Sequence, residues 1–290
     1  MKYVFFGSPQ FAAIILEKLI AAGTLPLAIV ASPDRPAGRK QELTPPLTKQ
    51  IAKDHSIPIF QPERPTPEIL TNLEADFFLV AAYAHIIPQA VLDLPPQGTF
   101  GIHPSLLPRL RGASPIQSTI LQGEPAGVTI YKMDEKVDHG PILASSALSN
   151  YSPDEDDYQT LEEKLAKLGA DIFLKTMPQY LEGNIQLSPQ DETQKTLTKK
   201  FTTADAEISE GDLRIALAGN NLEISQKNLR KILAFSHEPG AWTILEKPLE
   251  ENTYTLPANN RLKILGAKIA GQKLHITVFQ IAGKPVVTTA

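Results

Sequence analysis

Short apolar runs alternate with segments of helical periodicity along the first two thirds of the chain. The expected strands are residues 2–6, 25–31, 57–60, 76–82, 98–103, 128–133 and 141–149, and the expected helices are 11–22, 46–54, 67–74 and 161–181. Strands and helices that alternate in this way are typical of an α/β domain with a mainly parallel sheet. Such sheets bind ligands beyond the carboxyl ends of their strands. The sequence therefore predicts an α/β fold with its functional site at that edge.

The composition changes after this region. Between residues 186 and 204, Gln, Thr, Ser and Lys dominate and the apolar periodicity ends, which indicates a linker. Beyond it we expect helices at 213–217 and 226–234 and short strands at 241–245, 261–267 and 273–280. Short strands separated by Gly, Pro and Asn turns predict a small β-barrel or sheet. The expected domains are therefore 1–185 and a smaller β-rich domain over 205–290, joined by the linker.

The bulk composition excludes several classes of protein. The chain has no cysteine, which excludes disulfides, thiolate catalysis and Cys-based zinc sites. Its longest apolar runs, such as residues 77–82, are far shorter than the ~18 residues that cross a membrane, and its first residues do not resemble a signal peptide. A net charge of -4 argues against a surface that binds nucleic acid everywhere, although it allows a local basic patch. We expect a cytoplasmic monomer with no membrane partner.

The first strand is followed by the turn Gly7-Ser8-Pro9. A dinucleotide-binding turn has further glycines that let a pyrophosphate approach the helix N-terminus, and this turn lacks them. Pro9 also removes one amide donor. No Gly-rich Lys-Ser/Thr phosphate loop occurs in the sequence, so neither NAD nor ATP is expected. The simpler interpretation is a strand-to-helix turn with Ser8 as the helix cap.

His103 closes an expected strand and falls at the predicted ligand-binding edge of the sheet. Asp138 lies in a later turn that ends at Gly140 and should reach the same edge. A carboxylate beside an imidazole orients the ring and favours its protonated form, which suits a general base or a cationic donor. Arg109 and Arg111 either contact an anion or pair with carboxylates of the loop. The six histidines are scattered without ligand spacing, so we expect no metal.

Several motifs around these residues resemble the signature of the folate-dependent formyltransferases. They are Ser105-Leu-Leu-Pro108, Arg111-Gly-Ala-Ser-Pro115-Ile-Gln117, Gly127-Val-Thr-Ile130 and Val137-Asp138-His-Gly140. Within that superfamily the chain is similar to the methionyl-tRNA formyltransferase family. This similarity is carried by Phe6-Gly7-Ser-Pro-Gln-Phe11-Ala12, Asp34-Arg35-Pro-Ala-Gly-Arg39 and Ala82-Tyr83-Ala-His-Ile-Ile-Pro88. It is dense over residues 1–182 and thinner from 200 onward, where 200–208 and 239–243 continue it.

The resemblance implies a Rossmann-like catalytic domain and a C-terminal barrel that helps to hold tRNA. It implies transfer of the formyl group of 10-formyltetrahydrofolate to the amine of initiator methionyl-tRNA, and it matches His103, Asp138 and Gly101 to the catalytic positions. The positions expected to hold the folate are Tyr83, His85, Ile86, Ile87, Pro88, Ser105, Leu106, Leu107, Pro108, Asp134, His139 and Gly140. The loop expected to face the tRNA carries Arg35, Arg39 and Lys40. That loop is equally explained as a solvated basic loop.

Gly101 departs from the family, which has an asparagine at this position. An amide aimed at the developing oxyanion is typically worth ~100–1000-fold in rate. Three interpretations follow. His103 and Asp138 stabilise the oxyanion alone, or with a water in the space left by the missing side chain and help from His139. Alternatively, the chain is a weakened paralogue that still binds folate or tRNA, or it formylates another amine, such as a nucleotide-linked amino sugar.

Overall fold

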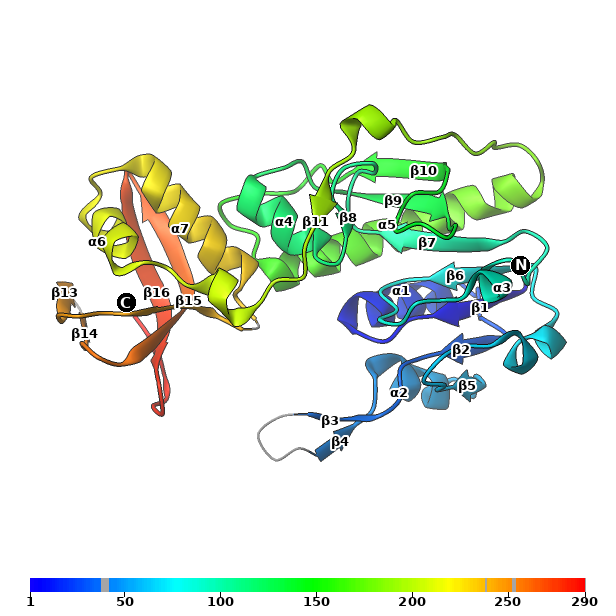
Figure 1. Cartoon of the computed structure of the whole chain (residues 1–290), viewed down its shortest axis with the longest axis horizontal. Coiled ribbons are helices and arrows are strands. Elements are labelled where there is room, and N and C mark those ends of the chain that lie inside the picture. Colours follow the sequence, from blue (N-terminus) through cyan, green and yellow to red (C-terminus); the bar gives the residue numbers. More distant parts are fainter. Residues whose placement is uncertain (38–41, 238, 252–253, 290) are drawn as a thin grey trace. The chain divides into compact units, whose positions relative to one another are not determined.

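The computed structural model describes residues 1–37, 42–237, 239–251 and 254–289. The chain divides into two compact units, each made of three segments. Figure 1 colours the ribbon by residue number from the N-terminus to the C-terminus. The first unit comprises Met1–Gly112, Ala126–Leu148 and Glu162–Leu197, and the second comprises Ala113–Pro125, Ser149–Leu161 and Thr198–Ala290. The domain boundaries at 185 and 205 stay a prediction.

The first unit is built on a seven-stranded sheet with the order β10-β9-β7-β6-β1-β2-β5. Its strands are β1 (Tyr3–Phe6), β2 (Ala28–Val30), β5 (Ile59–Phe60), β6 (Phe77–Val80), β7 (Thr99–His103), β9 (Gly127–Lys132) and β10 (Ile142–Ala147). β5, β2, β1, β6 and β7 pair in parallel, whereas β9 and β10 pair antiparallel. The central strands are fully buried, as continuous apolar runs require. The predicted mainly parallel sheet is confirmed.

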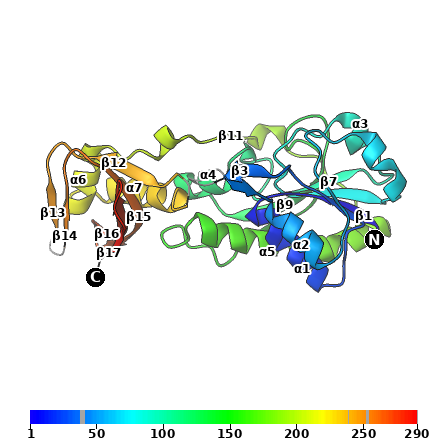
Figure 2. The same ribbon diagram turned by 90° about the horizontal axis from the view of Figure 1, so that it is seen from below.

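Helices α1 (Gln10–Ala21), α2 (Leu47–Asp54) and α5 (Tyr158–Leu181) lie on one face of this sheet (Figure 2). α5 packs through Phe173, whose ring lies 6.3 Å from Tyr3 and 5.9 Å from Phe77 between centroids. Gly169 of α5 lies so close to Ile102 that an added Cβ would come within 2.8 Å of its side chain. The short α3 (Gln89–Leu92) lies on the opposite face. Burial of these aromatic rings fixes the helices to the sheet.

Two local predictions are wrong. Residues 67–74 were expected to form one helix, but they form two 3-10 turns, η1 (Pro67–Ile69) and η2 (Thr71–Leu73). The second turn ends because Glu74 adopts the left-handed conformation, with φ of 48°. The loop after Asp34 instead forms a hairpin of β3 (Arg35–Ala37) and β4 (Glu42–Thr44).

Ser8 does not cap α1, as the sequence had suggested. Pro9 is the N-cap residue and no side chain caps the helix. The Ser8 hydroxyl instead accepts the Ser32 N–H at 2.8 Å and donates to the Ser32 hydroxyl at 3.0 Å. The turn therefore links the ends of β1 and β2 at the carboxyl edge of the sheet.

The second unit is rich in antiparallel strands, which confirms the predicted β-rich character of the C-terminal part. Its elements are α4 (Pro115–Gln122), η4 (Thr203–Ala206), α6 (Glu210–Ala218), α7 (Leu222–Ala234), β12 (Ala241–Ile244), β13 (Leu249–Glu251), β14 (Tyr254–Leu256), β15 (Arg261–Ala270), β16 (Lys273–Ile281) and β17 (Val286–Thr288). The strands pair as a four-stranded sheet, β12-β15-β16-β17, and a two-stranded ribbon, β13-β14. α7 contacts β15 and β16 and buries Leu229 and Ile232.

Residues 186–204, which the composition had suggested to be a linker, form short elements with specific contacts. They include η3 (Glu192–Gln194) and β11 (Leu197–Thr198), and β11 pairs with β8 (Arg111–Gly112). Ser188 and Ile142 exchange two backbone hydrogen bonds, at 2.7 and 2.9 Å. Composition could not predict these contacts, because the segment is held by backbone hydrogen bonds and side-chain amides and not by apolar side chains.

The buried phenol of Tyr3 makes the chain less stable at alkaline pH. Burial raises the pKa of Tyr3 above its ordinary value of 10.0. The stabilisation from the neutral phenol is complete below the pKa of the unfolded chain and is lost as the pH rises above it. We expect the difference in unfolding free energy between the parent and Tyr3→Phe to narrow above pH 10.0, measured by urea unfolding. A difference that stays constant to pH 11 or so would contradict this expectation.

Candidate active site

His103 is buried at the carboxyl end of β7, as predicted. Its Nε2 lies 2.9 Å from the carbonyl oxygen of Leu110. Because a carbonyl only accepts, Nε2 carries the proton, and the lone pair of the neutral ring is on Nδ1. Leu110 has a φ of 58°, an uncommon conformation for a branched residue, and it presents this carbonyl to the ring. The fold thus fixes the tautomer and leaves Nδ1 as the atom that exchanges protons.

Asp138 lies beside that nitrogen, with Oδ2 3.6 Å from Nδ1 of His103. The same oxygen accepts the Gly112 N–H at 2.8 Å, and Oδ1 accepts the Tyr131 hydroxyl at 2.6 Å. The side chain is only 14% exposed, so its charge is weakly screened by water. The two residues that the sequence singled out are therefore brought together by the fold.

Tyr131 fills the space over Gly101. The two residues are paired across β7 and β9. A Cβ built on Gly101 would lie 2.5 Å from Cε1 and 2.9 Å from the hydroxyl oxygen of Tyr131, closer than side-chain carbons approach. The expectation of a water in a space left at residue 101 is therefore wrong, because a ring occupies that space. The sequence pattern does not point to Tyr131, because its contact with Gly101 depends on the register between β7 and β9.

Arg111 is a structural residue that supports the loop of Asp138 through hydrogen bonds. The guanidinium is buried and donates to Oε1 of Gln190 at 2.7 and 3.1 Å, and to Glu192 at 2.6 and 3.3 Å. These donors lower the pKa of Glu192. The Gln190 amide in turn donates to the carbonyls of Asp138 and Gly140, at 3.0 and 2.8 Å. Of the two alternatives for Arg111, the structure supports pairing within the protein.

The loop after β9 is held by close contacts along its length. His139 Nδ1 lies 2.6 Å from Oδ2 of Asp134, which fixes the two predicted ligand-binding residues against each other. Any side chain on Gly140 would collide with the carbonyl oxygen of Lys132, so only glycine fits there. His139 is committed to Asp134 and approaches Glu192 at 3.8 Å. It is not directed by any hydrogen bond toward His103.

The loop after β6 leaves the sheet at the same edge as His103, because β6 and β7 are parallel and Val80 pairs with Gly101. Tyr83 packs edge-on against Phe6, with ring centroids 5.5 Å apart, and its hydroxyl is buried without a partner among the described residues. Burial raises the pKa of Tyr83, so the hydroxyl stays a donor. His85 lies against Tyr83, at 5.4 Å between centroids.

Two apolar side chains on the expected folate-binding loops face solvent. Ile86, on the loop after β6, is 86% exposed, and Val137, on the loop after β9, is 70% exposed. Ile87 packs instead on the hydrophobic core, and Pro88 precedes α3 as its N-cap. Exposed apolar side chains on these two loops are available to a ligand that covers them.

The loop of Ser105, Leu106, Leu107 and Pro108 is packed into the first unit. Ser105 donates to the Arg109 carbonyl at 2.6 Å, and the Ser105 carbonyl accepts from Thr129 at 2.8 Å. Leu107 is buried, and the Leu106 side chain lies against Gly127. These contacts give the loop a part in positioning Leu110 and His103. Direct ligand contact by its four residues stays a prediction.

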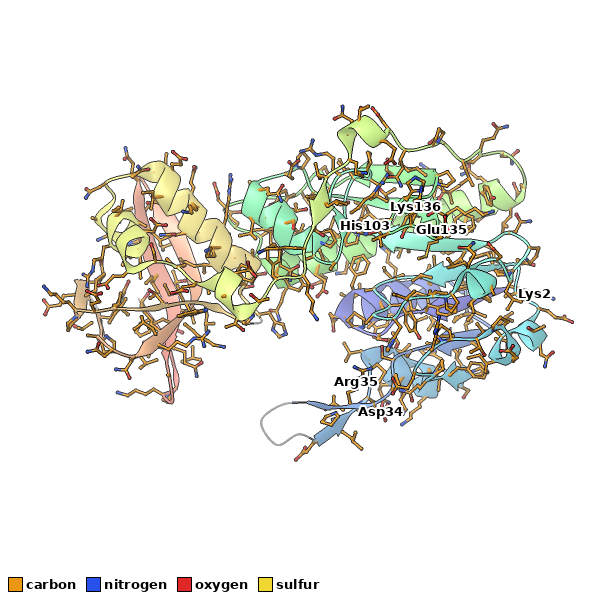
Figure 3. The ribbon with its side chains drawn as sticks, viewed as in Figure 1. Lys2, Asp34, Arg35, His103, Glu135 and Lys136 are labelled. Atoms are coloured by element: carbon orange, nitrogen blue, oxygen red, sulfur yellow. The ribbon has the colours of Figure 1, made fainter. Side chains whose placement is uncertain are left out.

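Arg35 lies on the β3–β4 hairpin, well apart from His103 (Figure 3). Its guanidinium is 3.6 Å from Glu63, and both side chains are largely exposed. Exposed pairs of this kind contribute little to stability. The other two residues predicted for tRNA, Arg39 and Lys40, lie outside the described residues.

Within the described ranges, no three His, Cys, Asp or Glu side chains form a group that could hold a metal ion. Among the same residues, no helix combines the length and apolar character needed to cross a membrane.

The amide of Gln190 should be a main support of the site. Its removal leaves the buried Arg111 and the carbonyls of Asp138 and Gly140 short of partners. We expect Gln190→Ala to lower the free energy of unfolding by about 1–3 kcal/mol. The matched control Gln194→Ala, on an exposed residue of the same segment, should change it by less than about 0.5 kcal/mol. Equal effects in urea unfolding would show that the bridge does not matter.

Known proteins resemble this chain in sequence and in fold. Residues 1–177 match the family model described as formyl transferase. The chain is 43% identical over 213 residues to the methionyl-tRNA formyltransferase of Chloroflexus aggregans, covering 72% of this chain and 68% of that protein. The fold is also similar to two solved structures at 16% identity. One is a methionyl-tRNA formyltransferase from Clostridium thermocellum, with a TM-score of 0.60 and coverage of 97% of this chain and 98% of that chain. The other is a 4-N formyltransferase from Francisella tularensis, with a TM-score of 0.63 and coverage of 88% and 96%. The chain belongs to the methionyl-tRNA formyltransferase family.

Proposed function

We propose that the chain transfers the formyl group of 10-formyltetrahydrofolate to the α-amino group of initiator methionyl-tRNA, in the cytoplasm, and so serves translation initiation. The observation that carries this proposal is the buried pair of His103 and Asp138 at the sheet edge of a chain of this family. His103 and Asp138 are the proposed catalytic residues. The chain acts as a monomer, with its catalytic part ending near residue 185 and its tRNA-binding part starting near 205.

The proposed reaction uses the fixed tautomer of His103. The neutral amine attacks the formyl carbon, a carbon–nitrogen bond forms, and the formyl oxygen takes the negative charge. Nδ1 of His103 accepts the proton that the amine loses, and Asp138, 3.6 Å away, stabilises the imidazolium. When the bond to N10 of the folate breaks, the same proton passes to N10. The imidazolium also supplies positive charge close to the oxyanion.

The loops after β6 and β9 are proposed to hold the folate. Exposed Ile86 and Val137 offer apolar surface to a flat aromatic ring system, and the unpartnered Tyr83 hydroxyl offers a buried donor. Asp134, fixed by His139, offers a carboxylate that can accept from ring N–H groups. These features fit a pterin, which combines a flat ring with donors along one edge.

The catalytic roles predict a defined loss of rate. We expect His103→Ala and Asp138→Ala to lower the single-turnover rate of methionyl-tRNA formylation by about 100-fold to 10,000-fold, because proton transfer and charge stabilisation are lost. Folate affinity, followed by the change in intrinsic fluorescence, should change little. The matched control is His55→Ala, on an exposed residue after α2.

The same assay distinguishes the alternatives. Turnover of a nucleotide-linked amino sugar by the parent, with none of methionyl-tRNA, would replace the proposed substrate. Binding of folate with no product at any pH would indicate a paralogue that only binds. A preference for elongator over initiator methionyl-tRNA would overturn the role in initiation.

Arg35 is proposed to contact tRNA phosphate, together with Arg39 and Lys40. Each neutralised phosphate of a single strand adds about 0.7 to the slope of log affinity against log salt, because a counterion is released. We therefore expect Arg35→Ala to weaken methionyl-tRNA binding and to lower that slope by about 0.7. Lys2→Ala is the matched control, since Lys2 is exposed at the other end of the first unit (Figure 3). An unchanged slope in filter binding would rule Arg35 out.

A further inference from the structure

Tyr131 is a titratable side chain beside Asp138 that has no role in the reaction proposed above. It is the last residue but one of β9, and it is only 3% exposed. Burial and the neighbouring Asp138 carboxylate raise its pKa well above the ordinary value of 10.0. The hydroxyl therefore stays protonated at the pH of any enzyme assay and always has one hydrogen to donate.

The recipient of that hydrogen is fixed by geometry. The hydroxyl is 2.6 Å from Oδ1 of Asp138, a length typical of a strong hydrogen bond to a carboxylate. The Gly112 N–H holds Oδ2 at 2.8 Å. With one donor on each oxygen, the plane of the carboxylate is set, and with it the direction of Oδ2 toward His103 Nδ1.

The hydroxyl can reach Asp138 only because residue 101 has no side chain. A Cβ there would lie 2.8 Å from Cζ of the Tyr131 ring, so even alanine would displace the ring. β7 and β9 each pair with a strand on both sides, so their backbones cannot easily separate to make room. Residues 101 and 131 therefore share one volume, which holds either a side chain from β7 or the ring from β9.

We propose that Tyr131 is a positioning residue for formyl transfer, whose hydroxyl, seated over Gly101, holds Asp138 toward His103. This inference rests on the proposed function, because Asp138 and His103 are its catalytic pair. The ring of Tyr131 occupies the volume that a side chain at residue 101 would need. The hydrogen bond of Tyr131 goes to Asp138, so the residue acts through that carboxylate.

The first test is Tyr131→Phe, which keeps the ring over Gly101 and removes only the hydroxyl. We expect kcat for methionyl-tRNA formylation to fall by about 10-fold to 100-fold, the usual effect of losing a hydrogen bond to a charged group. KM for both substrates should stay within about twofold, because the Tyr131 hydroxyl donates to Asp138 and acts through that carboxylate. Tyr180→Phe is the matched control, since it removes a hydroxyl from α5 in the same unit. A parent-like kcat in Tyr131→Phe would overturn the proposal.

A double-mutant cycle separates positioning from general packing. If Tyr131 acts through Asp138, then Tyr131→Phe should cost less than about twofold when Asp138 is already alanine. An unchanged cost in the Asp138→Ala background would contradict the proposal, because the hydroxyl would then act independently of the carboxylate.

Exchange of the shared volume gives a second test. Gly101→Asn alone should lower activity, because the new side chain displaces the Tyr131 ring, and Tyr131→Leu alone should lower it by removing the donor. The double variant Gly101→Asn/Tyr131→Leu should be at least about 10-fold more active than either single variant, since the amide then occupies the vacated volume. Melting curves of all three establish that they fold. Folded variants without this recovery would show that the two positions are not interchangeable.

A readout without substrate keeps this inference separable from the proposed function. The imidazole ¹⁵N signals of His103 report the environment of Nδ1 directly. We expect Tyr131→Phe to shift them and Tyr180→Phe to leave them unchanged. If the parent does not formylate methionyl-tRNA but this shift is seen, the proposed substrate fails and the positioning role stands. Unshifted signals in Tyr131→Phe overturn the positioning role, whatever the substrate.

Discussion

The buried guanidinium of Arg111 is the charge on which the arrangement of the site depends. A cation in a protein interior is tolerated only when its donors are satisfied, and here Gln190 and Glu192 satisfy them. While the side-chain oxygen of Gln190 accepts from Arg111, its NH₂ group donates to the carbonyls of Asp138 and Gly140. The hydrogen bonds that the buried charge requires therefore also hold the loop that carries the catalytic carboxylate. The neighbouring Gly112 N–H holds the carboxylate itself.

The sequence predicted those features that depend on local pattern. Buried strands read as apolar runs, so the mainly parallel sheet and the place of His103 at the end of β7 followed from periodicity. Tyr131 and Gln190 could not be found in this way. Tyr131 is an apolar-looking position in a buried strand, and only the register with β7 reveals that its ring lies over Gly101. Gln190 lies in a polar segment whose partners are far away in sequence.

The wrong prediction of the α1 cap also arises from a contact between residues that are far apart in sequence. Pro9 could replace Ser8 as N-cap because Ser32, from another strand end, competes for the Ser8 hydroxyl.

The departure at Gly101 was visible in the sequence as a loss, since an amide donor was missing. The structure changes its meaning, because the volume is filled from β9 and a hydroxyl stands where a side chain of β7 would lie.

The exclusion between a side chain at 101 and the ring at 131 also constrains how such a site evolves. A tyrosine at 131 in this orientation requires glycine at 101, because any Cβ there would lie 2.5 Å from the ring. A larger residue at 101 in turn requires a smaller residue at 131. The two positions can therefore be exchanged only together, and each sets which residues the other can accept.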